Sequence, residues 1–337
     1  MTGKKCAGGG LNRLSHIYDD IISLENILEA WKEFLKGKRN KRDVQEFQLH
    51  LMDNIISLHI DLKNKTYKHG GYTAFNISDP KPRNIHKASV RDRLLHHAVY
   101  RVLYPYFDKK FISDSYSCRL NKGTHRAINQ FSKYSREVSK NNTKQCWVLK
   151  CDIKKFFASI DHNSLQYIVI NYINEEGTNW LLNQIISSFR TFPDKGLPLG
   201  NLTSQLLVNI YMNEFDQYVK HGLKIRHYIR YADDFVILSP DKSTLIHNIR
   251  YIVCYLNNNL RLSLHPNKVF IKTLSSGVDF LGWVHFPDHR ALRAVTKRRM
   301  LKNLSSNPSK ESLVSYLGLL KWGNSIQLQK QITKSKI

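Results

Sequence analysis

Hydrophobic and polar residues follow a helical pattern over the first part of the chain. Apolar side chains recur every three or four positions between residues 14 and 62, and the basic cluster KGKRNKR at 36–42 interrupts them. This pattern predicts two helices joined by a solvated turn. A stretch rich in Pro, Gly and Lys follows and indicates short strands and turns. Residues 90–104 then have the spacing of an amphipathic helix.

From residue 145 onward the pattern alternates between strands and helices. Runs rich in β-branched and aromatic residues predict strands, and longer runs with a period near 3.6 predict helices. The predicted elements are a strand at 146–153, helices at about 162–175 and 202–220, a hairpin at 225–239, a helix at about 242–259, and strands near 268–273 and 278–285. The tail from Arg290 is basic and is predicted to be mostly helical.

Charge and composition narrow the classes of function. The 337 residues include 52 Lys and Arg against 27 Asp and Glu, which gives a formal charge of +25. This excess favours a polyanionic partner, with a basic protein that binds no nucleic acid as the alternative. The five cysteines form no C-x-x-C pair and the histidines lack metal-ligand spacing, so neither a disulfide framework nor a zinc site is indicated. A chain of this length suggests two or three lobes.

Membrane insertion is not expected. No apolar run approaches the ~20 residues of a membrane span, and the N-terminal residues MTGKKCAGGGLNRL contain no apolar signal stretch. We therefore expect a cytoplasmic protein without a membrane partner.

Carboxylates in two predicted strands are the first candidates for chemistry. The run RYADDFVILS at 230–239 carries Asp233 and Asp234, and Asp152 ends the strand WVLKCD. Neighbouring strands could bring the three like charges together, and such a cluster is stable when it binds divalent cations such as Mg²⁺. Two such ions can hold the attacking and leaving oxygens of a phosphoryl transfer. The alternative is that each Asp caps a turn.

Several further segments give the chain its resemblance to a known family. They are DPKPRNIHKASVRDRLLHHAV (79–99), SYSCRLNKGTHRAI (115–128), LKCDIKKFFASIDH (149–162), GLPLGNLTSQLLVNIYMNEFD (196–216), YADD (231–234), LSLHPNKVFI (262–271) and GVDFLGWVHF (277–286). In this order they resemble the motifs of reverse transcriptases over residues 14–325. The resemblance implies an α+β right-hand polymerase fold with fingers, a palm built on an antiparallel sheet with helices, and a short helical thumb. It places an N-terminal helical extension at 1–70, fingers at 71–145, the palm with a fingers insertion and the primer grip at 146–286, and the thumb at 287–337.

The same resemblance implies roles for individual residues. Asp152 and Asp233 would be direct ligands of two Mg²⁺ ions, for which Mn²⁺ could substitute, with the backbone carbonyl of Ile153 assisting and Asp234 completing the cluster. Phe157 would lie beneath the incoming sugar and exclude a 2′-hydroxyl. Phe156 is expected in the core if the strand continues through it, and the two rings could exchange roles if the chain turns just after Ile153. The remaining nucleotide-binding candidates are Lys81, Arg83, Leu199, Gly200 and Lys268. The candidates for contact with template and primer are Arg91, Arg93, Gly282 of the primer grip, and Arg293, Lys297, Arg298 and Arg299 of a basic thumb helix.

One departure from the usual motif narrows the subfamily. Most reverse transcriptases have Gln between Pro and Gly of the pocket motif, whereas this chain has Leu199 between Pro198 and Gly200, followed by NLTSQ. This combination resembles the reverse transcriptases of diversity-generating retroelements, which copy a template RNA unfaithfully at adenines. That resemblance implies a template RNA, a DNA or RNA primer, deoxynucleoside triphosphates and a small basic helical accessory protein that forms an oligomer. The alternatives are a retron or phage-defence reverse transcriptase, or an RNA-binding relic. Leu199 could also pack under the pocket without affecting fidelity.

Overall fold

The computed structural model describes residues 13–78, 82–306 and 309–334 of the chain. The chain folds into two compact units, each built from separate segments. The first unit comprises residues 1–112, 154–217 and 255–263, and the second comprises 113–153, 218–254 and 264–337. The long helix α11 (Lys242–Leu260) runs from the second unit into the first.

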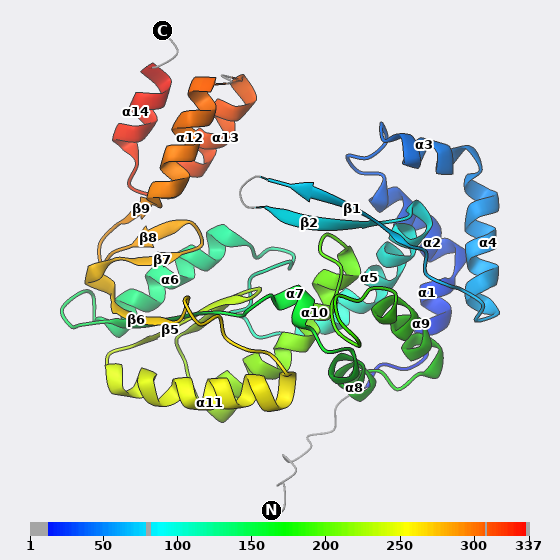
Figure 1. Ribbon diagram of the computed structural model, residues 1–337, viewed down its shortest axis with the longest axis horizontal. Coiled ribbons are helices and arrows are strands. Elements are labelled where there is room, and N and C mark those ends of the chain that lie inside the picture. The colour runs from blue at the N-terminus through cyan, green and yellow to red at the C-terminus, as the bar shows by residue number, and fades with distance from the viewer. Residues whose placement is uncertain (1–12, 79–81, 307–308, 335–337) are drawn as a thin grey trace, which may run out of the picture. The chain divides into compact units, whose positions relative to one another are not determined.

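The first unit is mostly helical (Figure 1). Its elements are α1 (Tyr18–Ile22), α2 (Leu24–Phe34), α3 (Arg42–Leu49), α4 (Leu51–Lys63), β1 (Tyr72–Ile77), β2 (Arg83–Ala88), α5 (Val90–Lys110), α7 (Phe156–Ser159), α8 (His162–Tyr172), α9 (Glu176–Ser187) and α10 (Leu202–Gln217). Helix α5 forms the centre, because it packs against both α2 and α10. Ser89 caps its first turn by accepting a hydrogen bond from the backbone N–H of Asp92.

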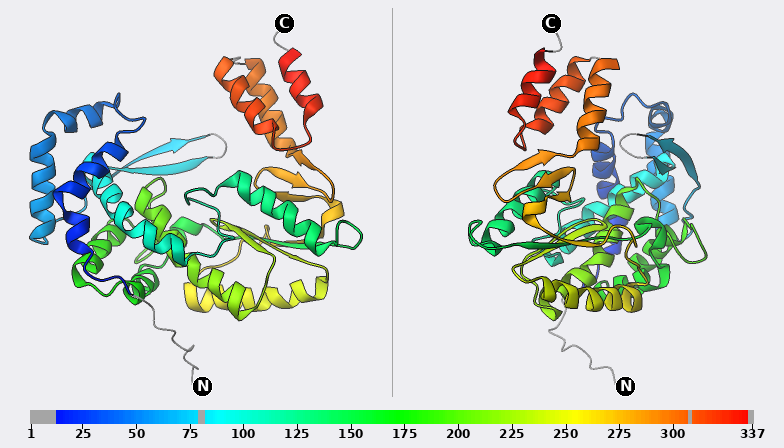
Figure 2. Two further views of the ribbon diagram at one scale, coloured as in Figure 1. Left: turned by 180° about the vertical axis from the view of Figure 1, so that it is seen from behind. Right: turned by 60° about the vertical axis from the view of Figure 1, so that its left-hand side comes forward.

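The second unit contains two antiparallel sheets (Figures 1 and 2). The larger sheet has the strand order β4 (Tyr228–Tyr231), β5 (Asp234–Ser239), β3 (Trp147–Asp152), β6 (Phe270–Thr273). The smaller sheet joins β7 (Val278–Phe280), β8 (Trp283–His285) and β9 (Arg290–Leu292). The other elements are α6 (Thr124–Val138), a π-helical turn at Tyr218–Gly222, a 3-10 turn at Leu274–Ser276, α12 (Ala294–Ser306), α13 (Lys310–Leu320) and α14 (Ile326–Lys334).

Helix α6 contributes to a hydrophobic core that the two sheets of this unit share. Its residues Phe131, Tyr134 and Val138 pack with buried residues of β3, β4 and β5 and with Phe280 of the smaller sheet. In Figures 1 and 2, α6 lies on one face of the larger sheet, and the part of α11 in this unit lies on the other face. Both faces of the sheet are therefore covered, which explains the apolar residues that β3 and β5 place on both faces.

Several predicted elements need correction. The region 14–62 forms four helices, because Ser23 and His50 end one helix and begin the next. The predicted strand at 278–285 is two strands, and the turn between them contains Leu281 and Gly282, both with positive φ. The helix predicted at 90–104 extends to Lys110, and α6 and α9 had no predicted counterpart. Within the described ranges, no helix combines the length and apolar character needed to cross a membrane.

Candidate active site

The acidic residues predicted to bind metal lie at one end of two neighbouring strands in the second unit. Asp152 is the last residue of β3 and is the register partner of Asp234, the first residue of β5. The backbone N–H of Ile153 donates to the carbonyl oxygen of Asp233 at 3.1 Å, which continues the pairing by one step. Since Tyr231 pairs with Asp234, Ala232 and Asp233 form a two-residue hairpin turn, with Ala232 in the left-handed region at φ 56°.

Two lysine side chains balance the charge of these carboxylates. The Nζ of Lys268 lies 3.0 and 3.2 Å from the two carboxylate oxygens of Asp152. The Nζ of Lys150 lies 3.2 Å from Oδ2 of Asp234 and donates to the carbonyl oxygen of Asp279 at 2.8 Å. The sequence had indicated Lys268 but not Lys150. Lys150 lies two residues before Asp152, and alternate residues of a strand lie on the same face of the sheet. This spacing indicates that Lys150 lies near the acidic site.

The environment of Asp234 suits a cation. The pKa of this carboxyl is raised to about 6, mainly by burial and also by the nearby carboxylates of Asp233 and Asp152, while Lys150 opposes the rise. Its Oδ1 is buried and has no hydrogen-bond partner. The available donors are all carboxylate or carbonyl oxygens, which fit a hard divalent cation. Among residues 13–78, 82–306 and 309–334, however, no three His, Cys, Asp or Glu side chains are already gathered closely enough to hold a metal.

The two adjacent phenylalanines after Asp152 belong to the first unit and differ in burial. The strand ends before them, with Lys155 in the left-handed region at φ 46°, and Phe156 begins the short helix α7. Phe156 is 4% exposed, which confirms the prediction that it is a core residue. Phe157 is half-buried, and its carbonyl oxygen accepts from the backbone N–H of Leu197 at 2.8 Å. The fold thus holds Phe157 next to the segment that carries Leu199.

Leu199 and its neighbours pair with the hairpin of β1 and β2. The carbonyl oxygen of Leu199 accepts from the backbone N–H of His86 at 3.2 Å, and the side-chain amide of Asn201 donates to the carbonyl oxygen of His86 at 2.8 Å. Gly200 has φ 102°, and a Cβ there would lie 2.9 Å from Cγ2 of Ile85. Both observations require glycine between Leu199 and Asn201.

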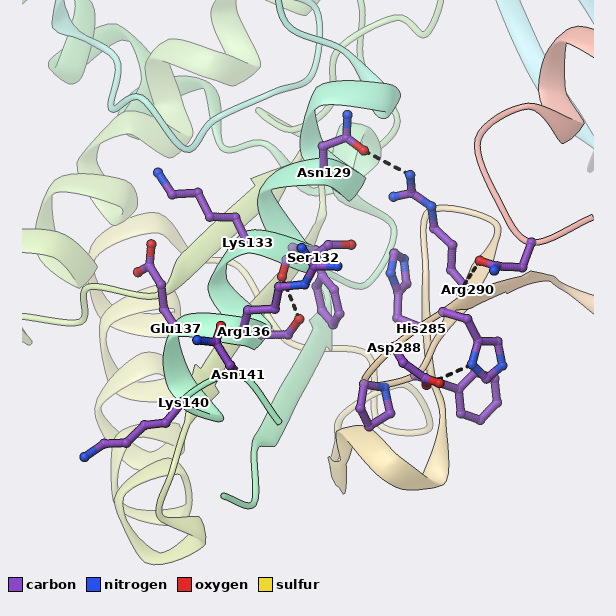
Figure 3. A pocket seen from close by; sticks show the side chains of 16 residues that line it. Asn129, Ser132, Lys133, Arg136, Glu137, Lys140, Asn141, His285, Asp288 and Arg290 are labelled. Atoms are coloured by element: carbon purple, nitrogen blue, oxygen red, sulfur yellow. Dashed lines mark hydrogen bonds and ion pairs between the residues drawn. The ribbon is translucent and has the colours of Figure 1, made fainter. Parts of the chain in front are cut away.

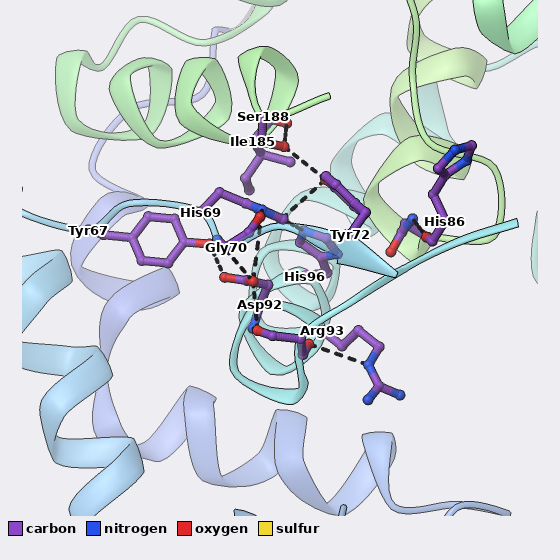
Figure 4. Close-up of polar contacts among 12 residues, drawn as sticks. Tyr67, His69, Gly70, Tyr72, His86, Asp92, Arg93, His96, Ile185 and Ser188 are labelled. Atoms are coloured by element: carbon purple, nitrogen blue, oxygen red, sulfur yellow. Dashed lines mark hydrogen bonds and ion pairs between the residues drawn. The ribbon is translucent and has the colours of Figure 1, made fainter. Parts of the chain in front are cut away.

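The hairpin itself is fixed at its base by one buried carboxylate (Figure 4). Asp92 accepts hydrogen bonds from Tyr67 Oη at 2.7 Å, from the backbone N–H of Gly70 at 3.1 Å and from Ser89 Oγ at 2.6 Å. Gly70 lies just before β1 and Ser89 directly after β2, so Asp92 ties both ends of the hairpin to α5. Arg83 is the exposed first residue of β2, whereas Lys81 lies outside the described residues.

The residues predicted to contact template and primer fall into two groups. Arg91 and Arg93 form ion pairs with Asp61 and Asp43, and their guanidinium groups lie over the rings of Tyr67 and Phe34. These contacts hold both guanidinium groups against helices of the first unit. In the second unit, Arg293 pairs with Asp279, Lys297 and Arg298 are exposed on α12, Arg299 is half-buried, and Gly282 lies in the β7–β8 turn.

Comparison with known proteins agrees with this geometry. The sequence profile of the family "Reverse transcriptase (RNA-dependent DNA polymerase)" matches residues 67–285. Protein YkfC of Escherichia coli (strain K12) is 26% identical over 275 residues, which cover 70% of this chain and 70% of YkfC. The group II intron-encoded protein LtrA of Lactococcus lactis subsp. cremoris is 23% identical over 299 residues, which cover 66% of this chain but only 47% of LtrA.

Among solved structures, apo telomerase from Candida Tropicalis, truncated from the C-terminal domain, has a similar fold. The TM-score is 0.50 at 11% identity, and the match covers 72% of this chain and 60% of that chain. At this identity the likeness concerns the fold alone, and it confirms the predicted α+β right-hand polymerase fold. Because the family profile matches more than half of the sequence, including Asp152, Asp233 and Asp234, this chain belongs to the reverse transcriptases, the RNA-dependent DNA polymerases.

Proposed function

We propose that the chain copies RNA into DNA at the carboxylates of β3 and β5, using two Mg²⁺ ions. Asp152, Asp233 and Asp234, with the carbonyl oxygen of Ile153, would hold the ions. When bound, such ions neutralise the triphosphate and align the attacking and leaving oxygens. The observation that carries the proposal is the register pairing of Asp152 with Asp234, which brings acidic residues 82 positions apart to one sheet edge, together with the unpartnered buried Oδ1 of Asp234.

The lysines of the site would respond to the nucleotide. Lys268 is 48% exposed along its side chain and has only Asp152 as a charged partner in the described part of the chain. Its amine can therefore move from the carboxylate to a triphosphate oxygen when cations bind to Asp152. Lys150 is 11% exposed and is held by both Asp234 and Asp279, so it would stay in place and keep Asp234 oriented.

The other substrate contacts follow the sequence resemblance. We propose that Phe157 and Gly200 shape the sugar pocket and that Arg83 of the hairpin and Lys81 bind the triphosphate. Gly282, Arg293 and the basic residues of α12 would contact primer and template. The division into an extension at 1–70, fingers at 71–145, palm at 146–286 and thumb at 287–337 is part of this proposal.

The decisive experiment removes one metal ligand and leaves the nucleic acid contacts. Asp233→Asn should abolish Mg²⁺-dependent DNA synthesis on a primed RNA template, while RNA binding stays near the wild-type value, because the change removes a carboxylate charge and no phosphate contact. Asp53→Asn, an exposed position of α4, is the matched control and should retain activity. Full activity in Asp233→Asn would contradict the metal assignment.

We also propose that this enzyme is an error-prone member from a diversity-generating retroelement. Leu199 supports this, because its side chain offers no hydrogen bond to the nascent pair and must hold it by shape alone, which discriminates weakly. A structured template RNA and a small basic helical accessory protein would be its partners. Sequencing of cDNA made with equal dNTP concentrations tests the proposal, and an error rate at template adenines no higher than at other bases would contradict it.

A further inference from the structure

A groove on the second unit lies between α6 and the turn that joins β8 to β9 (Figure 3). Its volume is about 730 Å³. Lys133, Arg136 and Lys140 line its α6 side, with the two lysine side chains extending away from the turn in Figure 3. Phe286 and His289 line the side of the turn. We call this hollow the α6 groove. None of these five residues belongs to the carboxylate site or to the proposed nucleotide contacts.

The basic and acidic side chains of the α6 groove differ in whether they have an oppositely charged neighbour. Lys133 and Arg136 lie one turn apart on α6, and Lys140 follows in the turn after its end. All three are exposed, and the described residues supply no ion pair for them. Glu137 has a cationic neighbour in Arg226, and a histidine lies beside each acidic residue of the groove. Glu137 lies 3.2 Å from His227 and 3.5 Å from Arg226, and Asp288 lies 3.0 Å from His289. The groove therefore presents a net positive wall.

The opposite wall offers a flat ring. Phe286 and His289 stack with ring centroids 4.6 Å apart and an interplanar angle of 10°. Phe286 rests against Gly277, where even a Cβ would lie 2.9 Å from the ring. The His289 side chain is 43% exposed. Phe286 thus packs closely against Gly277, and the exposed imidazole of His289 stacks on its ring.

Hydrogen bonds hold the turn that carries this stack. The backbone N–H of Phe286 donates to the carbonyl oxygen of His289 at 2.9 Å, and Asn142 Nδ2 donates to the carbonyl oxygen of Pro287 at 3.1 Å. Arg290 donates to Asn129 Oδ1 at 3.0 Å, which ties the turn to α6 (Figure 3). Both walls are therefore fixed with respect to each other.

We propose that the α6 groove binds a single-stranded segment of RNA. Cations that follow a backbone and an aromatic ring on which a base can stack are the two features that single-strand binding sites share. A duplex would satisfy the cations but could not offer an unpaired base to His289, and an acidic polypeptide would not need the ring. The inference rests on the proposed function in that RNA is the substrate, and it adds a binding surface for template RNA outside the polymerase site.

The experiment measures binding of fluorescently labelled oligouridine RNA by the full chain across a salt series. The groove variant is Lys133→Gln/Arg136→Gln/Lys140→Gln. Its matched control is Lys224→Gln/Lys242→Gln/Arg250→Gln, which removes the same charge from exposed positions of the second unit. We expect affinity at ~50 mM salt to fall at least about tenfold in the groove variant, and the slope of log K against log salt to become shallower by about 2. The control should change both quantities far less.

The stacking contact is tested separately. His289→Ala should weaken binding roughly fivefold or more at every salt concentration, whereas His289→Phe, which keeps a ring, should bind like wild type. RNA that carries 4-thiouridine should crosslink to the peptide containing His289. The inference would be overturned if the groove and control variants lost the same RNA affinity. It would also be overturned if duplex RNA or polyglutamate displaced the labelled RNA as well as unlabelled single-stranded RNA does. DNA synthesis on a short primed template should persist in the groove variant. If the wild-type protein itself synthesises no DNA, that result would contradict the proposed function and not the RNA-binding role of the α6 groove.

Discussion

Lys150 lies with its Nζ 3.2 Å from Oδ2 of Asp234, within the larger sheet of the second unit. Both side chains are largely buried, at 11% and 20% exposure. Desolvation raises the pKa of Asp234 to about 6, and Lys150 opposes that rise. Because the folded pKa exceeds that of the unfolded chain, the ionised carboxyl costs stability as pH rises from about 4 to 6. Lys150 reduces this cost in the absence of a cation.

Replacing Lys150 should therefore make stability depend on Mg²⁺. We expect Lys150→Gln to lower the free energy of unfolding at neutral pH by about 1–3 kcal/mol in EDTA, and Mg²⁺ to restore part of the loss by binding the folded state. Urea denaturation in EDTA and in Mg²⁺ measures both values. Lys272→Gln, at an exposed position of β6, is the control and should show no such difference. A loss of equal size in EDTA and Mg²⁺ would mean that no cation binds beside Asp234.

A second prediction concerns acid stability and His285. This side chain is 2% exposed between the rings of Phe131 and Phe280, and burial lowers its pKa to about 4. The folded imidazole stays neutral where the unfolded one takes up a proton, so stability should fall as pH drops from about 6.5 to 4. The full loss from this group is on the order of 3 kcal/mol.

Urea midpoints measured across this pH range test the role of His285. The variant His285→Gln cannot take up the proton and should show a shallower decline than wild type. An unchanged slope in the variant would place the acid sensitivity at other groups, such as His97, whose pKa burial also lowers to about 4.

The sequence predicted the acidic site better than its surroundings. The two apolar strands indicated that Asp152 could lie beside Asp233 and Asp234, and the order of the motifs favoured this over three separate turn caps. The register of β3 and β5 places Asp152 opposite Asp234. The spacing of Lys150 and Asp152 places both on one face of β3 but does not identify Asp234 as the partner of Lys150. Its role depends on Asp279, which is 129 positions away.

The boundaries of helices and strands were less predictable for local reasons. The four helices of 14–62 share one apolar pattern, and only the hydrogen bond that Ser23 Oγ accepts from the backbone N–H of Asn26 marks the start of α2. The break between β7 and β8 depends on Leu281 in the left-handed region, which no propensity indicates for leucine. The ion pairs of Arg91 and Arg93 with α4 and α3 likewise required tertiary structure, because their sequence context resembles a nucleic-acid-binding helix.

A third prediction separates the two phenylalanines of α7. If Phe157 lies beneath the sugar, Phe157→Val should lower the preference for dNTPs over rNTPs by at least roughly tenfold, because space for a 2′-hydroxyl opens. Phe156→Leu changes a core residue of the same helix and should keep the preference while losing some stability. Single-nucleotide incorporation with matched dNTP and rNTP pairs measures the ratio. If Phe156→Leu lost the preference for dNTPs and Phe157→Val kept it, Phe156 would be the residue beneath the sugar.

The last prediction concerns Leu199, whose side chain distinguishes this enzyme from reverse transcriptases with Gln in the pocket motif. Its backbone pairs with His86 through a carbonyl oxygen, so Leu199→Gln should keep the backbone in place and change only the side chain. If the missing amide leaves the nascent pair loosely held, Leu199→Gln should lower misincorporation opposite template adenine. One recovered hydrogen bond contributes about 0.5–1.5 kcal/mol, which corresponds to a few-fold change in discrimination.

Sequencing of cDNA from wild type and Leu199→Gln, made on one RNA with equal dNTP concentrations, measures this change. Leu199→Met is the matched control, because it has a similar volume and no amide, and it should keep the wild-type error rate. Equal adenine error in wild type and Leu199→Gln would show that fidelity is set by other contacts, such as Arg83 of the hairpin or an accessory protein. A fall of the same size in Leu199→Met would attribute the effect to side-chain shape, because methionine cannot supply the hydrogen bond that the prediction requires.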